Sequence, residues 1–206
     1  MAGVIEHVHD NKDKQATYTY QIGRYRKALK EEFYLEAMMI VYSMMEDRLR
    51  ALLFYAGVFD DRNSLKVSNK TKSDLKSILS SKYGEGKQFS LTTIKGKMEL
   101  IYSIMEWVGA ANTSENEYDQ YQMALKSLME STDLEQLKDV LDQISQWVKY
   151  RNDIMHASMN KNIDAMYSGM REKVEMGMEY ARILDAHVKD LKKCNIVRKK
   201  MKMQLR

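Results

Sequence analysis

Apolar residues recur at alternating three- and four-residue steps through several long stretches of this chain, and none of its 206 residues is proline. This spacing places apolar side chains along one face of an α-helix. Proline is the residue that most strongly breaks a helix, so its absence favours long helices. No alternation of apolar and polar residues, which would indicate strands, extends over a useful length. The sequence therefore predicts an all-α fold, most simply an up-and-down bundle of four to five helices, some of them long.

The limits of the expected helices follow from where each apolar stripe begins and ends. Glycines end the first two helices, and Thr132 with Glu135 forms a capping-box pattern that starts the fourth. In the last helix, Gly177 and Ala181 are small enough for a neighbouring helix to approach closely. The expected helical ranges are about 18 or 24 to 56, 92 to 108, 115 to 130, 132 to at least 151, and 163 to 191.

Segments outside this helical pattern define the expected domain organisation. We expect residues 1–17 to form a mobile leader, residues 18–195 a single helical domain, and residues 196–206 a basic tail. Residues 60–90 are rich in Ser, Lys, Asn and Gly, which predicts an irregular basic insertion with a short helix near 74–81.

Positive charge is concentrated in two regions, although the net charge is only +4. Basic residues outnumber acidic ones in 62–97 and in 189–206, whereas acidic residues predominate in 112–142. Two basic regions can attract a polyanion such as RNA, but a solvated loop and a frayed tail would have the same composition. The candidate RNA-binding residues are Lys66, Lys70, Lys72, Arg198, Lys199 and Lys200.

Other features narrow the expected environment and chemistry. No apolar run is long enough to span a membrane, and residues 1–14 contain no apolar signal core. Cys194 is the only cysteine, which excludes an internal disulfide and fits a reducing cytoplasm. His7 and His9 have no other Cys or His nearby, so we expect neither a metal site nor a cofactor. The expectation is a cytoplasmic protein without a membrane partner.

The most informative polar residues lie in the stretch from Tyr150 to Ala157, which reads Tyr-Arg-Asn-Asp-Ile-Met-His-Ala. Arg151 falls in register with the apolar residues Ile144, Val148 and Met155. Burying a guanidinium in that register is costly unless an anion pairs with it. The stretch therefore predicts either a structural ion pair or a site that binds an anion.

Arg151 and His156 are five positions apart, which on a straight helix corresponds to about 140° of rotation and about 7.5 Å of rise. The two side chains would then not share one face. Two arrangements can bring them together. Either the helix ends or loosens between them, or the same stretch of a second subunit completes the site across a two-fold axis.

RNA cleavage is the chemistry that suits this pair of side chains. An imidazole that titrates near neutral pH can accept the proton of a ribose 2′-hydroxyl or donate one to the leaving 5′-oxygen. The guanidinium of Arg151 can bind the scissile phosphate and stabilise the charge that develops on it. Asn152 can orient either His156 or a phosphate oxygen. This reaction requires no metal ion.

The run Arg-Asn-Asp-Ile-Met-His resembles the R-x4-6-H motif, in its common R-N-x-x-x-H form, of the HEPN superfamily. The resemblance implies an all-helical bundle and a metal-independent endoribonuclease of toxin–antitoxin, abortive-infection or CRISPR-linked defence systems. It implies a homodimer in which two motifs form one composite cleft, with RNA as the substrate and an antitoxin protein as a further partner. By resemblance, Arg151 and His156 are catalytic and Asn152 supports them.

One position departs from part of the family. Members paired with a nucleotidyltransferase antitoxin often carry a tyrosine two residues after the histidine, where this chain has Ser158. Regulation by nucleotide transfer to that tyrosine is therefore not expected. Two alternatives to the nuclease remain open: a non-catalytic helical module that dimerises or binds RNA or protein, and a purely structural role in which Arg151 pairs with an acid and His156 caps a helix.

Overall fold

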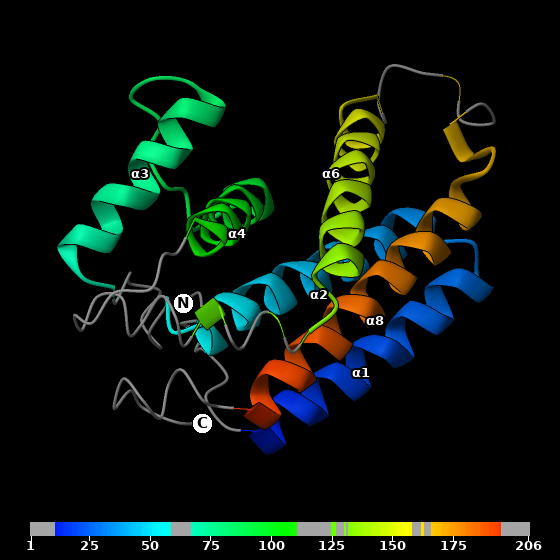
Figure 1. The fold of residues 1–206 in the computed structure, drawn as a ribbon. Coiled ribbons are helices and arrows are strands. Elements are labelled where there is room, and N and C mark those ends of the chain that lie inside the picture. Colours follow the sequence, from blue (N-terminus) through cyan, green and yellow to red (C-terminus); the bar gives the residue numbers. More distant parts are fainter. Residues whose placement is uncertain are drawn as a thin grey trace, which may run out of the picture.

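The computed structural model describes residues 11–58, 67–110, 125–126, 130, 132–157, 162 and 166–194. These residues contain six long helices and no strand, which confirms the predicted all-α fold (Figure 1). The helices, in chain order, are α1 (Asn11–Lys30), α2 (Tyr34–Tyr55), α3 (Asn69–Tyr83), α4 (Ile94–Gly109), α6 (Leu134–Ala157) and α8 (Met170–Cys194).

Helix α2 is the centre of the bundle. It packs against α1, α4 and α8, and α6 in turn packs against α8. Figure 1 shows α1, α2 and α8 side by side, with α6 crossing them at a steep angle and the α3–α4 pair at one end. Ala37, Met38, Val41, Met45 and Leu49 of α2 are fully buried, because α2 has neighbours on several sides.

The predicted single helix from 18 or 24 to 56 is wrong, because the chain turns between α1 and α2. Glu32 adopts a left-handed backbone conformation with φ 61°. The N–H of Phe33 donates to the carbonyl of Ala28 at 2.8 Å, and that of Glu32 to Leu29 at 3.4 Å. This is the Schellman arrangement that ends many helices, usually with glycine at the left-handed position. Here a glutamate occupies that position, so the sequence carries no glycine signal for the turn.

The start of the helical domain also differs from the prediction. Helix α1 begins at Asn11, so residues 11–17 are helical. The predicted boundary of the leader at residue 17 is therefore wrong. Lys14 contacts Asp47 of α2 at 2.9 Å, which fastens the start of α1 to the bundle. Residues 1–10 and the predicted basic tail, 196–206, lie outside the described residues.

Much of the predicted irregular insertion, 60–90, is helical. Helix α3 spans Asn69–Tyr83, well beyond the short helix expected near 74–81. Ser68 caps it by accepting a hydrogen bond from the N–H of Thr71 at 3.1 Å. Leu75 and Leu79 are buried, and Trp107 of α4 donates to Asp74 at 3.4 Å. The helix expected over 115–130 lies almost wholly outside the described residues.

Helices α6 and α8 approach closely at Gly177, as its small size predicted. A methyl group added at Gly177 would lie 2.6 Å from an indole carbon of Trp147 in α6. At the start of α6, Asp133 accepts a hydrogen bond from the N–H of Gln136 at 2.9 Å. The α6–α8 contact matters for function because α6 carries both Arg151 and His156.

Candidate functional site

Arg151 and His156 lie on one uninterrupted helix. Helix α6 continues from Leu134 through Ala157, so it neither ends nor loosens between the two residues. The prediction that a break in the helix brings the two side chains together within one chain is therefore wrong. Five helical positions separate the side chains by about 140° around the axis, and a single chain does not direct them to the same point.

Arg151 lies in the buried stripe of α6 and reaches across to α2. Its side chain is half-buried, and its guanidinium carbon lies 4.6 Å from the centre of the Tyr42 ring. A cation over an aromatic face at this distance is attracted by the negative face of the ring. One terminal nitrogen donates to Oδ1 of Asn152 at 3.0 Å, and the other lies 2.9 Å from Sδ of Met39.

The guanidinium of Arg151 has neutral neighbours in place of an acid. Within the part of the chain that the structure describes, no carboxylate lies at ion-pair distance from it. Its Nε is buried and has no hydrogen-bond partner among the residues that the structure describes. A buried, unpaired donor is rare in native proteins. Among the described residues, these contacts disagree with a structural ion pair at Arg151 and leave its positive charge available to an anion.

Tyr42 is itself held between two other helices. Burial and the charge of Glu46 raise the pKa of the Tyr42 phenol, whereas Arg151 and the backbone N–H of Ile94 act in the opposite direction. Ile94 is the first residue of α4, so this influence on the pKa of the phenol comes from the start of that helix. Tyr42 therefore connects the α6 arginine to the junction of α2 and α4.

An ion pair one turn further along α2 supports this junction. The ammonium of Lys97 in α4 lies 2.8 Å from a carboxylate oxygen of Glu46. Lys97 is buried, with 3% of its surface exposed, whereas the Glu46 side chain is 34% exposed. Pairing is what allows a charged lysine to be buried at this depth. The pair links α2 and α4 next to Tyr42.

His156 lies in the last turn of α6 with its side chain exposed. No hydrogen bond joins it to any other described residue, so nothing in those residues assigns it a capping role. Asn152 is also exposed and accepts from Arg151. Two exposed apolar side chains accompany these residues: Met39, which contacts Arg151, and Met155, which precedes His156.

Two of the predicted RNA-binding lysines, Lys70 and Lys72, lie on a helix away from this site. Lys70 is exposed and Lys72 half-buried in the first turn of α3. That helix packs against α4, and Figure 1 shows it apart from α6. Lys66, Arg198, Lys199 and Lys200 lie outside the described residues. The structure thus brings neither Lys70 nor Lys72 together with Arg151.

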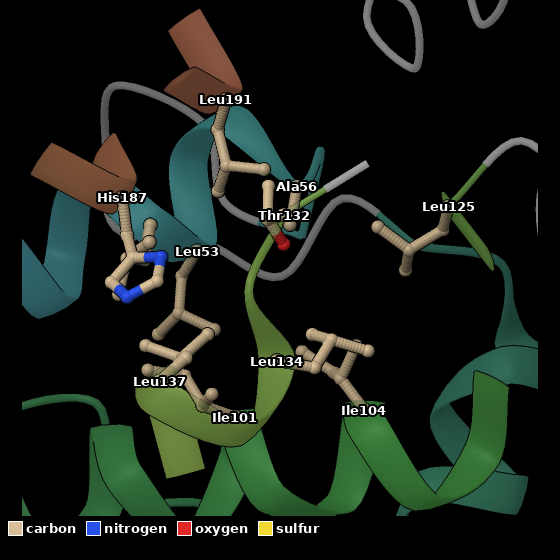
Figure 2. A pocket seen from close by; sticks show the side chains of 11 residues that line it. Leu53, Ala56, Ile101, Ile104, Leu125, Thr132, Leu134, Leu137, His187 and Leu191 are labelled. Atoms are coloured by element: carbon tan, nitrogen blue, oxygen red, sulfur yellow. The ribbon is translucent and has the colours of Figure 1, made fainter. Parts of the chain in front are cut away.

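A buried histidine that the sequence analysis did not single out lies in the core. Figure 2 shows His187 of α8 beside Leu53, at a small cavity of about 40 Å³. His187 is 5% exposed, and within the described part of the chain its Nε2 has no hydrogen-bond partner. Burial lowers the pKa of the imidazole, although Asp133 and Asp190 act to raise it. The helical register of α8 was the available signal, because His187 adjoins the buried positions Leu184, Val188 and Leu191.

Two open clefts of about 430 Å³ each flank α1. In the cleft between α1 and α2, Lys14 pairs with Asp47 and Arg24 with Glu36, so its charges largely neutralise one another. A polar cluster of Tyr18, Asp47 and Arg48 separates the two clefts and joins α1 to α2. Its internal pairing indicates a structural role.

The search for metal ligands covers only the described residues, and no three His, Cys, Asp or Glu side chains cluster there as ligands would. Over the same residues, no helix is both long and apolar enough to cross a membrane. No protein-family model, no curated protein and no solved structure matches this chain.

Proposed function

We propose that this chain is a metal-independent endoribonuclease of the HEPN type, acting in a toxin–antitoxin, abortive-infection or other antiviral defence system. The observation that carries the proposal is the guanidinium of Arg151, which lies on the ring of Tyr42 without a carboxylate partner among the described residues. A cation held by neutral neighbours is suited to binding a phosphate. Asn152 adjoins it, and the exposed His156 follows on the same helix.

The proposed reaction begins with the 2′-oxygen of the ribose attacking the adjacent phosphorus. His156 accepts the 2′-hydroxyl proton or donates one to the leaving 5′-oxygen. Arg151 binds the phosphate and stabilises the charge that develops on it. The products are then a 2′,3′-cyclic phosphate and a 5′-hydroxyl. Because the nucleophile comes from the RNA itself, we expect cleavage to persist in EDTA.

A two-fold homodimer is part of the proposal. Within one chain the regular helix α6 directs Arg151 and His156 about 140° apart. The same stretch of a second copy would supply the missing group across the axis. Light scattering at micromolar concentration should therefore give the mass of a dimer. A monomer that still cleaves RNA would contradict the composite site.

The decisive experiment compares cleavage of single-stranded RNA by the wild-type chain, His156→Ala and Arg151→Lys. Each variant should lose at least about 100-fold in rate, the usual scale for a positioned acid–base group or charge-stabilising donor. Lysine should fail at 151 because a point charge does not reproduce the planar, two-pronged contact. RNA with a 2′-deoxy sugar at the cut site should resist cleavage.

Lys149→Ala provides a matched control, because Lys149 is exposed on the same helix. It should cleave at the wild-type rate. If both site variants cleave like the wild type, or if EDTA stops the reaction, the assignment of roles is wrong.

RNA binding by the basic regions stays part of the proposal. If Lys66, Lys70, Lys72 and the tail residues guide RNA, affinity should fall steeply with salt, because neutralised phosphates release counterions. Removing residues 198–206 should weaken binding to all sequences alike. An affinity that does not respond to salt would contradict this role.

The alternative is a non-catalytic helical module that dimerises or binds RNA or protein. Exposed Met39 and Met155 favour it, because exposed apolar side chains near a charged site suit a partner surface. This alternative predicts a dimer without any cleavage of RNA, and with dimerisation weakened by Met155→Asp.

A further inference from the structure

We propose that Tyr42 is the positioning residue of Arg151: its ring holds the guanidinium in place and leaves the charge free for a phosphate of RNA. The inference rests on the proposed nuclease function and adds to it a residue from α2. The motif itself lies wholly on α6, 109 positions later in the chain.

The first argument is electrostatic. A half-buried guanidinium needs a favourable neighbour, and the ring centre of Tyr42, 4.6 Å away, provides one. A carboxylate at the same place would hold Arg151 equally well, but it would neutralise the charge and repel a phosphate. An aromatic face attracts a cation without cancelling its charge. The ring is therefore the kind of support that suits anion binding.

The second argument concerns the hydrogen-bond donors of Arg151. A guanidinium has five N–H donors in a rigid fork. The two described contacts, to Asn152 Oδ1 and Met39 Sδ, are with neutral acceptors and use one donor on each terminal nitrogen. No described residue bonds to the buried Nε. The ring of Tyr42 and the two neutral acceptors thus fix the orientation of the Arg151 side chain. The remaining N–H donors of its terminal nitrogens can bind a phosphate.

The third argument is that Tyr42 is supported in turn. Tyr42 lies on α2, which packs against α4. One turn along α2, Glu46 pairs with the buried Lys97 of α4 at 2.8 Å. Functional side chains need neighbours whose own positions are fixed, and α4 provides that support for Tyr42.

The test uses three variants. Tyr42→Leu removes the ring, Tyr42→Phe keeps the ring without the hydroxyl, and Tyr34→Leu is a control on the same helix. Tyr34 is buried and packs on Tyr167 with ring centres 5.9 Å apart, so it tests for general loss of stability. Tyr42→Leu should lower kcat/KM for RNA cleavage about tenfold, which corresponds to the usual strength of a partly buried cation–π contact.

Tyr42→Phe and Tyr34→Leu should stay within about twofold of the wild type in kcat/KM. The pH profile of Tyr42→Leu should keep the wild-type shape, because the proton is exchanged by His156. Loss of cleavage in Tyr42→Phe equal to that in Tyr42→Leu would overturn the role of the ring.

A double-mutant cycle separates positioning from a merely structural effect. The readout is the affinity for a 2′-fluoro RNA oligonucleotide, which has no 2′-hydroxyl to attack. Tyr42→Leu should weaken binding in the wild-type background and have almost no effect in Arg151→Met, because the ring acts through Arg151. Equal losses in both backgrounds would overturn the proposal.

A nuclear magnetic resonance measurement decides the matter even if the chain cleaves no RNA. The Arg151 Nε–H signal, assigned by its absence from Arg151→Lys, should be shifted upfield by the ring and should exchange slowly with water. Tyr42→Phe should retain both properties, and Tyr42→Leu should lose both. Wild-type protein that fails to cleave would end the nuclease proposal alone. An unchanged Arg151 signal in Tyr42→Leu would end the positioning proposal alone.

Discussion

The indole of Trp147 in α6 packs directly on Gly177 in α8. Its Nε1–H donates a 2.6 Å hydrogen bond to the carbonyl oxygen of Lys173, one turn earlier in α8. Trp147 precedes Arg151 by one helical turn, so this contact also sets the direction in which the end of α6 leaves the bundle. The position of the candidate site therefore depends on a close approach between two helices.

Gly177→Ala should destabilise the fold by about 1–3 kcal/mol, the usual cost of overpacking. The added methyl would lie 2.6 Å from the indole of Trp147, so one of the two helices must shift. Urea unfolding measures the loss. Gly23→Ala is the matched control, because no atom of the described residues lies within 4 Å of a methyl at that position of α1. It should leave stability unchanged or raise it by about 0.5–1 kcal/mol.

The turn between α1 and α2 should prefer glycine at position 32. Glu32 has φ 61°, so Glu32→Gly removes backbone strain and should stabilise the fold by up to about 1 kcal/mol. Glu32→Val should destabilise it, because a β-branched residue is poorly tolerated there. Thermal unfolding of both variants checks the sign. Glu31→Gly, at a residue without positive φ, should lower stability; the same gain at both positions would contradict this account of the turn.

The ion pair of Glu46 and Lys97 should respond unequally to removal of its two members. Glu46→Met leaves the ammonium of Lys97 buried without its partner and should cost about 3 kcal/mol. Lys97→Met leaves a carboxylate that is 34% exposed and can be hydrated, so it should cost much less. The double variant should recover most of the loss. Equal losses for the two single variants in urea unfolding would contradict the burial argument.

Stability should fall as the pH drops below about 6.5, because the buried His187 resists protonation. Its pKa in the folded chain lies below the ordinary value of 6.5. As the pH falls from 6.5 towards the pKa of His187 in the folded chain, the imidazole is protonated in the unfolded chain but not yet in the folded one. Protonation therefore stabilises the unfolded state over this pH range. Above pH 6.5 the His187 imidazole is neutral in both the folded and the unfolded chain, so this loss of stability is absent. His187→Leu should flatten this part of the stability–pH curve measured by urea unfolding.

Asp47 acts in a separate pH range. Burial alone would raise the pKa of its carboxyl, but Arg48 and Lys14 outweigh burial and lower it from 3.8 to about 2. Its contribution is present above pH 3.8 and is lost as the pH falls towards 2. A fall in stability between pH 6.5 and 4 that persists in His187→Leu would contradict the role of His187.

The buried stripes of the helices were predictable because they depend on local spacing. Leu137, Leu141 and Ile144 of α6 are buried as their spacing required, and Arg151 follows them in the same stripe. The turn at Glu32 was not predictable from the apolar pattern. Leu29 and Leu35 continue the helical spacing of apolar residues on both sides of the turn. A glutamate in the left-handed conformation, unlike a glycine, is not a residue type that signals the end of a helix.

The sequence by itself determined the helical class and the stripe that half-buries Arg151, whereas the structure decided that one unbroken helix carries both Arg151 and His156. The helical class and the stripe depend on residues within a few turns of one another. Only the tertiary structure decided what Arg151 meets. Tyr42 and Met39 come from α2, far away in the chain. Such contacts arise from the packing of whole helices, and helical periodicity shows which face is buried but not which side chain lies opposite.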